Sequence, residues 1–242
     1  MAEYTALIAH TAEKYLSLLG KDFDVLPLPS DTRLDVPVAA HTDMNLFVLG
    51  NTVVMSKNYV ETNPFIVSYL KEVCALDTIL SDGERRREYP YDVMLNVLVS
   101  GNVCFSLKEH TADEVKELIA RNNMLHVNVK QGYAACSALA FGTSIITADR
   151  SIQRATEALG IECLLISDGG IRLDGYSEGF IGGSSGVCGN KIYFTGNVKL
   201  HPDGEKILRF VEKGGFEAVS LSEDILTDVG GIRFLKNIRS LK

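Results

Sequence analysis

Apolar and polar positions follow a repeating order along this chain. Each repeat begins with a short apolar run that ends at a turn residue, continues with a second apolar run, and then shows helical followed by strand periodicity. Aligned on the turn residue, the first runs read HTDMNLFVLG (41–50), DVMLNVLVSG (92–101), YAACSALAFG (133–142), FIGGSSGVCG (180–189) and DVGGIRFLKN (228–237). Successive turn residues are 51, 41, 47 and 48 positions apart. Such a period indicates a solenoid, a propeller or another array of similar units.

The first four runs end in a glycine that is followed by Asn or Thr and by a second apolar run. The second runs are 53–55, 103–105, 145–147 and 192–194. Two apolar runs separated by a Gly-containing turn pair predict a β-hairpin.

After each hairpin the spacing predicts one helix and then one strand. The helices are predicted from 62 to 73, 111 to 119, 149 to 159 and 202 to 213, and the strands over 76–80, 125–129, 161–166 and 216–221. Start signals support three of these helices: Pro64 at a first helical position, a capping box from Thr111 to Glu114, and Asp149 as a cap. At the N-terminus the spacing predicts a helix over 2–19 that stops at Gly20, and then a short strand.

The repeating unit is therefore hairpin, helix, strand, and it occurs four times in full. The tail from Asp228 supplies a hairpin without a helix, and residues 1–28 supply a helix and a strand without a hairpin. Joining these ends gives a fifth unit, and a ring buries the apolar faces of every unit without terminal caps. We predict an α/β protein with one domain over residues 1–242: a closed five-bladed α/β propeller, with hairpin strands towards the axis and helices outside.

Composition narrows the function classes. The 242 residues are 46% apolar and 23% charged with a net charge of −7, which is typical of a globular protein and argues weakly against nucleic acid or anionic membranes as partners. The one basic run, 85–87, lies among acidic residues and is expected in a solvated loop. Five cysteines without metal-ligand spacing, no leader pattern and no apolar run of membrane-spanning length predict reduced thiols, a cytoplasmic location and no metal or cofactor.

The fivefold repeat resembles the pentein superfamily, the fold of guanidine-modifying enzymes such as arginine deiminases, dimethylarginine hydrolases, agmatine deiminases and amidinotransferases. His41-Thr-Asp43 is similar to the H-x-D with which arginine deiminases place a catalytic histidine and a substrate-binding carboxylate. Leu125-His126-Val-Asn-Val is similar to the segment that holds the general-acid histidine of dimethylarginine hydrolases. His126 lies 16 residues before Gly142, whereas His41 lies nine before Gly50, so the spacing favours His41 on the inner strand.

The same resemblance implies a nucleophilic cysteine shortly after a Gly-rich start of the last inner strand, because a thiolate attacks the guanidinium carbon in these enzymes. Here Gly230 and Gly231 are followed by Ile232-Arg-Phe-Leu, and no cysteine lies beyond Cys188. Cys136 and Cys188 are expected to be buried, inert thiols. The resemblance therefore implies the fold and a pocket, and we expect hydrolysis to be lost or to proceed without the usual thiol.

Small polar residues stand five positions before four of the turn residues. They are Asn45, Asn96, Ser137 and Ser184. At equivalent places on inner strands they would form a polar ring around the axis, which either binds a ligand or satisfies its own hydrogen bonds with water.

Charged residues near the expected mouth of the ring are further candidates. Asp43, Asp92 and Asp228 either attract an amine or a guanidinium or cap strands in water. Strand alternation puts Asp43 on the same face as His41 and Asn45. His41 is either a general acid/base or a hydrogen-bonded loop residue, and Arg233 either pairs with Asp43 or binds a carboxylate.

Two function classes follow. The first is a small-molecule site on the axis for a guanidino or amino-acid ligand. The second is an interaction scaffold similar to the ribosome anti-association initiation factors, which share the ring without catalysis. We favour the first class, because the His41–Asp43 motif and the polar ring fall at one level of the ring.

Overall fold

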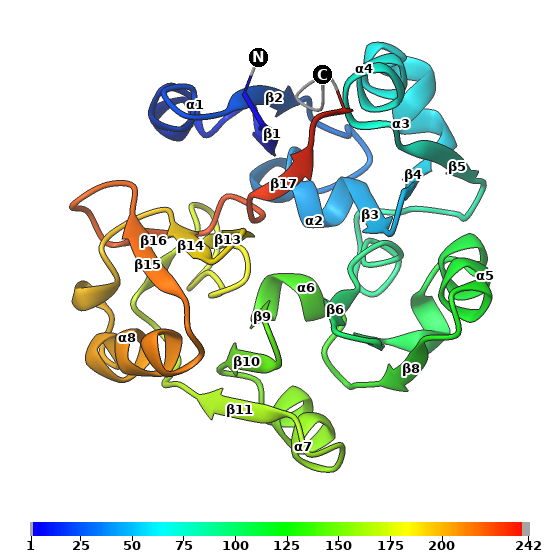
Figure 1. Ribbon diagram of the computed structural model, residues 1–242. Helices are drawn as coiled ribbons and strands as arrows, with labels where there is room; N and C mark the ends of the chain where they lie inside the picture. The colour runs from blue at the N-terminus through cyan, green and yellow to red at the C-terminus, as the bar shows by residue number, and fades with distance from the viewer. Residues whose placement is uncertain (1, 239–242) are drawn as a thin grey trace.

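The computed structural model describes residues 2–238, which form a mixed α/β fold. Within these residues there are five three-stranded sheets, and Figure 1 shows them arranged around a common centre with most helices at the periphery. The sheets are β17–β1–β2 (Arg233–Lys236, Tyr4–Ala9, Asp24–Leu28), β3–β4–β5 (Leu46–Leu49, Thr52–Ser56, Asp77–Ser81), β6–β7–β8 (Leu98–Ser100, Val103–Ser106, Leu125–Asn128), β9–β10–β11 (Ala138–Phe141, Ser144–Thr147, Glu162–Leu165) and β13–β14–β15 (Ser185–Cys188, Lys191–Phe194, Glu217–Ser220). Each has one antiparallel and one parallel pair of strands. A two-stranded sheet joins β12 (Ile171–Arg172) to β16 (Leu226–Thr227).

The four predicted hairpins are confirmed. Their strands pair antiparallel across two-residue turns, as in Leu49 opposite Thr52 and Phe141 opposite Ser144. The first turn residue has a φ of +60°, +57°, +52° and +59° at Gly50, Gly101, Gly142 and Gly189. Glycine reaches this left-handed region without a steric penalty, and the turn matches the twist of the two strands.

The helix and the parallel strand that follow each hairpin are also confirmed. The helices are α4 (Phe65–Cys74), α5 (Asp113–Arg121), α7 (Arg150–Glu157) and α8 (Gly204–Lys213), with a short α3 (Lys57–Thr62) before the first. Asp149 caps α7 as expected, because its carboxylate accepts hydrogen bonds from the backbone N–H groups of Ser151 and Ile152. None of the helices within residues 2–238 has both the length and the apolar character that crossing a membrane would need.

The capping box predicted at Thr111 does not form. Ala112 occupies the cap position of α5, and the Thr111 hydroxyl donates instead to the carbonyl of Leu107. The side chain of Glu114 points away from its own helix. It accepts hydrogen bonds from the hydroxyl of Ser81 and the backbone N–H of Asp82, at the end of the preceding sheet. A contact between neighbouring repeats has therefore replaced the local cap.

The helix predicted over residues 2–19 is wrong in its first half. Tyr4–Ala9 is the strand β1, and only Glu13–Leu19 is helical (α1). Residues 5–9 form an uninterrupted buried run between β17 and β2, and such a short run cannot be assigned to helix or strand by periodicity. β1 pairs antiparallel with β17, with Tyr4 opposite Lys236, so one sheet is built from both ends of the described chain.

Asn237 joins these two ends at the place where the other sheets have a hairpin turn. Its Oδ1 accepts a hydrogen bond of 2.7 Å from the hydroxyl of Thr5. Its Nδ2 donates to the Ala2 carbonyl and to Asp24 Oδ2, each at 3.0 Å. The side chain of one buried asparagine thus ties β17 to β1 and β2 without a covalent link.

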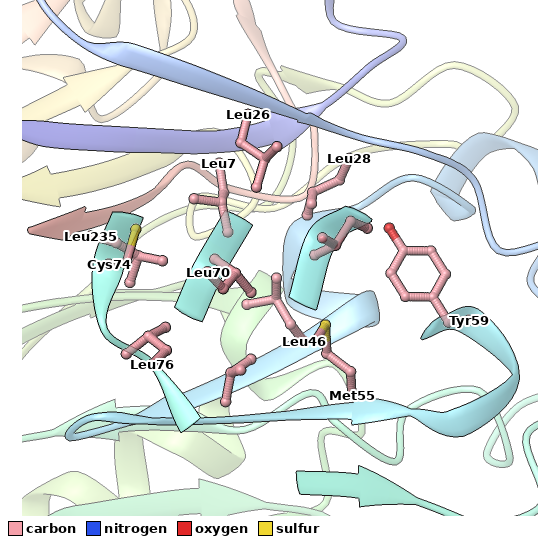
Figure 2. Packing of buried hydrophobic residues seen from close by; sticks show 12 residues of the cluster. Leu7, Leu26, Leu28, Leu46, Met55, Tyr59, Leu70, Cys74, Leu76 and Leu235 are labelled. Carbon is pink, nitrogen blue, oxygen red and sulfur yellow. The ribbon is translucent and has the colours of Figure 1, made fainter. Parts of the chain in front are cut away.

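Apolar side chains seal the same junction. Figure 2 shows leucines of the first sheet, Leu7, Leu26 and Leu235, facing Leu46 of β3 and Leu70 of α4. All five belong to one buried cluster, so the sheet made from the chain ends packs directly against the next repeat.

We predict that Asn237→Ala lowers the free energy of unfolding by about 1–3 kcal/mol, because buried partners lose their hydrogen bonds. For a chain of this size that corresponds to a fall in Tm of roughly 2–4 °C per kcal/mol, measurable by thermal denaturation. Asn102→Ala, in an exposed hairpin turn, is the matched control and should change Tm little. Equal effects of the two substitutions would contradict the role given to Asn237.

Candidate functional site

Short helical turns bring polar side chains to the centre of the molecule. α2 (Thr42–Asn45) precedes β3 and α6 (Ala134–Ser137) precedes β9, and Figure 1 shows both turns near the centre. Side chains from α2, α6 and the segment before β17 lie together there and are at most 8% exposed: His41, Asp43, Cys136 and Asp228. We call these four residues the axial cluster.

His41 and Asp228 are neighbours in the axial cluster but do not share a hydrogen bond. His41 Nδ1 lies 3.8 Å from Asp228 Oδ1. The carboxylate accepts instead from the backbone N–H groups of Phe180 and Gly230, both at 2.9 Å. Burial lowers the pKa of His41 and raises that of Asp228, while their mutual attraction opposes both shifts. The imidazole is therefore mainly neutral at neutral pH.

Asp43 is the least satisfied group of the axial cluster. Within residues 2–238 neither carboxylate oxygen has a hydrogen-bond partner, although both are buried. Burial and the charge of Asp228 raise its pKa well above the usual range, and the Cys136 thiol and Arg233 act in the opposite direction. A buried carboxylate without donors carries a large desolvation cost when it ionises.

Cys136 is buried against these carboxylates. Its sulfur lies 3.1 Å from Nδ2 of Asn96, which donates to it. Burial, followed by the charges of Asp43 and Asp228, raises the pKa of the thiol well above its usual value. The thiol is therefore protonated at neutral pH in the unliganded protein. Cys188, which was also expected to be buried, is partly exposed on β13 instead.

Glycines allow Asp228 to reach the centre. A Cβ on Gly183 would lie 2.0 Å from Asp228 Oδ1, and one on Gly182 would lie 2.2 Å from the Ala135 carbonyl oxygen. The Gly182–Gly186 segment is therefore closely packed against the residues around it.

The four residues of the predicted polar ring are buried, but they do not line one common cavity. Asn45 donates to the carbonyls of Ala39 and His41, and Ser184 donates to that of Ile181. Asn96 contacts Cys136 and accepts from the N–H of Ala135. The hydroxyl of Ser137 has no partner within residues 2–238, and it lines a separate cavity beside Asp149. Strand alternation failed here because residues 42–45 and 134–137 are helical, so the period of two does not apply to them.

Asp92 lies apart from the contacts of the axial cluster. Its Oδ2 accepts a hydrogen bond of 2.6 Å from the hydroxyl of Tyr133, and burial raises its pKa. His126 is on β8, where it bonds to Ser106, and burial lowers its pKa to about 4. Of the two candidate histidines, His41 is thus the one in the axial cluster.

The expectation that residues 85–87 lie in a solvated loop is wrong for Arg85. Its guanidinium is buried and donates to Asp31 at 3.1 Å, to Asn45 at 3.2 Å and to the carbonyl of Met44. Arg86 remains exposed, as expected. Arg85 supplies donors to the Met44 carbonyl and to the side-chain amide oxygen of Asn45, both in α2. Arg85 therefore fixes the turn that carries Asp43. This role could not be predicted from the sequence, because the acidic residues around Arg85 are typical of a solvated loop.

Two separate cavities approach the axial cluster. A cleft of about 620 Å³ lies between the start of α1 and the loops at 36–37 and 172–175, and its lining includes His41 and Asp228. A smaller channel of about 160 Å³ lies between the inner strands, and its lining includes Asp43 and Arg233. The cleft has the size of a typical small-molecule site. Within residues 2–238 no group of three acidic, His or Cys side chains is arranged to hold a metal ion.

The sequence model of a protein family, described as a family of unknown function (DUF6873), matches residues 8–233. The chain belongs to this family. No curated protein matches it in sequence.

Several solved structures are similar to this chain in fold, at low sequence identity. A dimethylarginine dimethylaminohydrolase variant from Pseudomonas aeruginosa, complexed with citrulline, is 9% identical with a TM-score of 0.55, covering 97% of this chain and 98% of its own. An agmatine deiminase of C. jejuni is 8% identical with a TM-score of 0.54, covering 91% and 88%. SxtG, an amidinotransferase from Microseira wollei, is 10% identical with a TM-score of 0.54, covering 88% and 75%. The chain therefore has the pentein fold that its repeats resemble.

We predict that Asp43→Asn stabilises the protein at pH 8 by about 1–3 kcal/mol, because it removes the buried charge that Asp43 carries once it ionises. The folded-state pKa of Asp43 is raised, so the stability from its protonated form is present at low pH and is lost as pH rises through that pKa. The gain from the substitution should therefore be larger at pH 8 than at pH 4. Urea unfolding across this range measures it.

The matched control is Asp113→Asn, an exposed carboxylate at the start of α5. A gain for Asp43→Asn that is absent at pH 8, or equal to that of the control, would show that the Asp43 charge is compensated.

Proposed function

We propose that this chain binds a small guanidino or amino-acid-like ligand at the axial cluster, through the cleft that ends at His41 and Asp228. The single observation that carries the proposal is the buried carboxylate of Asp43, which has no N–H or O–H donor within residues 2–238, has the Cys136 thiol as its neighbour, and lies in the field of a second buried carboxylate, Asp228. We further propose a single domain that forms a closed five-bladed propeller around this site. The pairing of β1 with β17 supports the joining of residues 1–28 and 228–242 in the fifth blade.

A cation with several N–H donors fits the chemistry of the axial cluster. When both carboxylates ionise, they lie beside a neutral imidazole. Arg233 is the one cation among the main influences on the pKa of Asp43. A guanidinium supplies both a positive charge and donors in a planar fork, which matches carboxylate geometry. An amine supplies the charge with fewer geometric constraints.

Cysteine-dependent hydrolysis is not part of this proposal. The Cys136 thiol has a raised pKa, and the neighbour that acts on His41 is Asp228. A protonated thiol is a weak nucleophile, and the carboxylate beside it, Asp43, raises the pKa of the thiol further. Cys136 is nevertheless the cysteine of the axial cluster, so it is the residue through which turnover should be tested.

We predict that agmatine and arginine stabilise the protein thermally, by about 2.7 kcal/mol at 100 times the dissociation constant. The raised pKa values of Asp43 and Asp228 mean that a proton must leave before a cation pairs with them. Affinity should therefore rise with pH, as titration calorimetry at pH 6 and pH 8 measures. Asp43→Asn and Asp228→Asn should weaken binding at least tenfold, and Asp113→Asn should not.

No thermal shift with any guanidino, amino or amino-acid compound at millimolar concentration would overturn the proposal. Co-sedimentation with ribosomes in that case would support the alternative function, an interaction scaffold similar to the ribosome anti-association factors.

We also predict no appreciable conversion of arginine, agmatine or methylated arginines to ureido products, because the thiol is held protonated. Colorimetric ureido detection measures this. Turnover that disappears in Cys136→Ala but persists in Cys188→Ala would contradict the prediction and identify Cys136 as a relocated nucleophile.

A further inference from the structure

The channel between the inner strands has one charged group that the proposed function does not use, Arg233, and it also reaches Asp43, on which that function rests. Its lining comes from β6, β9, β13 and β17 together with the start of α2, and it shares no lining residue with the cleft at His41 and Asp228. It is therefore a distinct cavity that meets the axial cluster from another side. Asp43 and Arg233 are its charged lining residues.

Arg233 lies in this channel without a protein partner for its guanidinium. Within residues 2–238 its side chain makes no ion pair and no hydrogen bond, and the residue is partly exposed. Desolvation lowers the pKa of the guanidinium, and Asp43 opposes that shift. The two charges thus influence each other across the channel without meeting. Asp43 likewise has two buried oxygens with no donor within the same residues. A cavity bordered by an unpaired cation and an unpaired anion has room for a group that bridges them.

We infer that the channel is a second small-molecule site, which binds a small zwitterionic amino acid between Arg233 and Asp43. The carboxylate of the ligand accepts paired hydrogen bonds from the guanidinium of Arg233, since Arg and carboxylate groups match as a planar fork. Its ammonium group donates to the oxygens of Asp43. The buried carboxylate of Asp43 and the partly exposed guanidinium of Arg233 then each gain a partner, and the ligand brings no net charge into the channel.

A ligand with only one charge satisfies only half of this site. An anion would pair with Arg233 but would add a third negative charge beside Asp43 and Asp228. A cation would pair with Asp43 and leave the guanidinium of Arg233 without a partner, next to a new positive charge. The arrangement of charges therefore selects for a zwitterion.

Glycines keep the channel open and limit its size. Gly182, Gly186 and Gly231 line it, and an added Cβ on Gly182 or Gly186 would lie within 2.3 Å of a backbone oxygen. A Cβ on Gly231 would lie 4.0 Å from Asp43 Oδ2, directly beside the proposed ammonium position. The channel, at about 160 Å³, has about a quarter of the volume of the cleft, at about 620 Å³. That volume suits glycine or a short ω-amino acid better than a molecule as long as arginine.

The test is titration calorimetry of the whole chain with glycine, β-alanine and γ-aminobutyrate, in which the two charges are increasingly far apart. Propionate and ethylamine serve as probes with one charge. At least one zwitterion should bind, and each single-charge probe should bind at least tenfold more weakly than that zwitterion. Binding of none of the three zwitterions would mean that the channel holds water only and would overturn the inference. Equal affinity for propionate would overturn it in favour of a simple anion site.

Variants of Arg233 separate this site from the cleft. Arg233→Gln should raise the dissociation constant of the bound zwitterion at least tenfold, while agmatine, which has no carboxylate, should be affected less, because Arg233 acts on it only through the charge of Asp43. Arg233→Lys keeps the charge but loses the fork, so it should give an intermediate loss and also keeps the test informative if the glutamine variant fails to fold. Arg154→Gln, on the exposed face of α7, is the matched control. Unchanged zwitterion affinity in folded Arg233→Gln would overturn the inference.

The two proposals fail separately, although both include Asp43. Agmatine binding without zwitterion binding removes the channel site and leaves the proposed function intact. Zwitterion binding that depends on Arg233, without any agmatine binding, removes the cleft site and leaves the channel site.

Discussion

The pairing of β17 with β1 is the contact on which the centre of this molecule depends. It joins segments more than 220 residues apart, with Leu7 opposite Arg233 in the strand register. Asp228 and Arg233 reach the centre only because the segment that carries them is fixed at this edge. The N–H of Asp43 then donates to the carbonyl of Gly230 at 3.1 Å, which connects α2 to the same segment. A contact that holds the two chain ends together therefore also assembles the charged centre.

That centre stores an unfavourable electrostatic arrangement. Protein interiors rarely keep carboxylates without donors, because their desolvation is costly. The fold keeps Asp43 in place through neighbours that are hydrogen-bonded to the surrounding structure, namely the Arg85–Asp31 ion pair behind α2 and the amide of Asn96 at α6. Such a combination, rigid support around an unsatisfied group, is typical of a binding site that gains its missing partners from a ligand. For the same reason, we expect that neutralising Asp43 increases stability and weakens ligand binding.

Much of the architecture could be predicted because its determinants are local. Each hairpin depends on a glycine at a left-handed turn position, and α7 depends on the adjacent cap Asp149, so a short window of sequence contains the cause. The errors arose where a distant contact decides the outcome. Residues 4–9 are a strand because β17 and β2 flank them. The side chain of Glu114 accepts a hydrogen bond from the preceding sheet in place of the expected bond at the start of its own helix.

The candidate site was predictable in part for the same reason. The motif at His41 and Asp43 was recognisable by spacing, but the helical turns at 42–45 and 134–137 reorient every side chain that strand alternation had assigned to one face. Cys136 came to the centre through α6, and Arg85 was buried by its match to Asp31 and Asn45. The periodicity of the sequence predicts neither the position of Cys136 nor the burial of Arg85.

The central claim is that the axial carboxylates are a binding site for a cation. A crystal structure of the chain with agmatine, at a resolution that orients the guanidinium plane, tests it most directly. The account predicts ligand density at the end of the cleft, with N–H groups of the guanidinium within hydrogen-bond distance of Asp228 or Asp43 and with Cys136 unmodified. Agmatine bound only elsewhere, with Asp43 still lacking a donor at its oxygens, would contradict it.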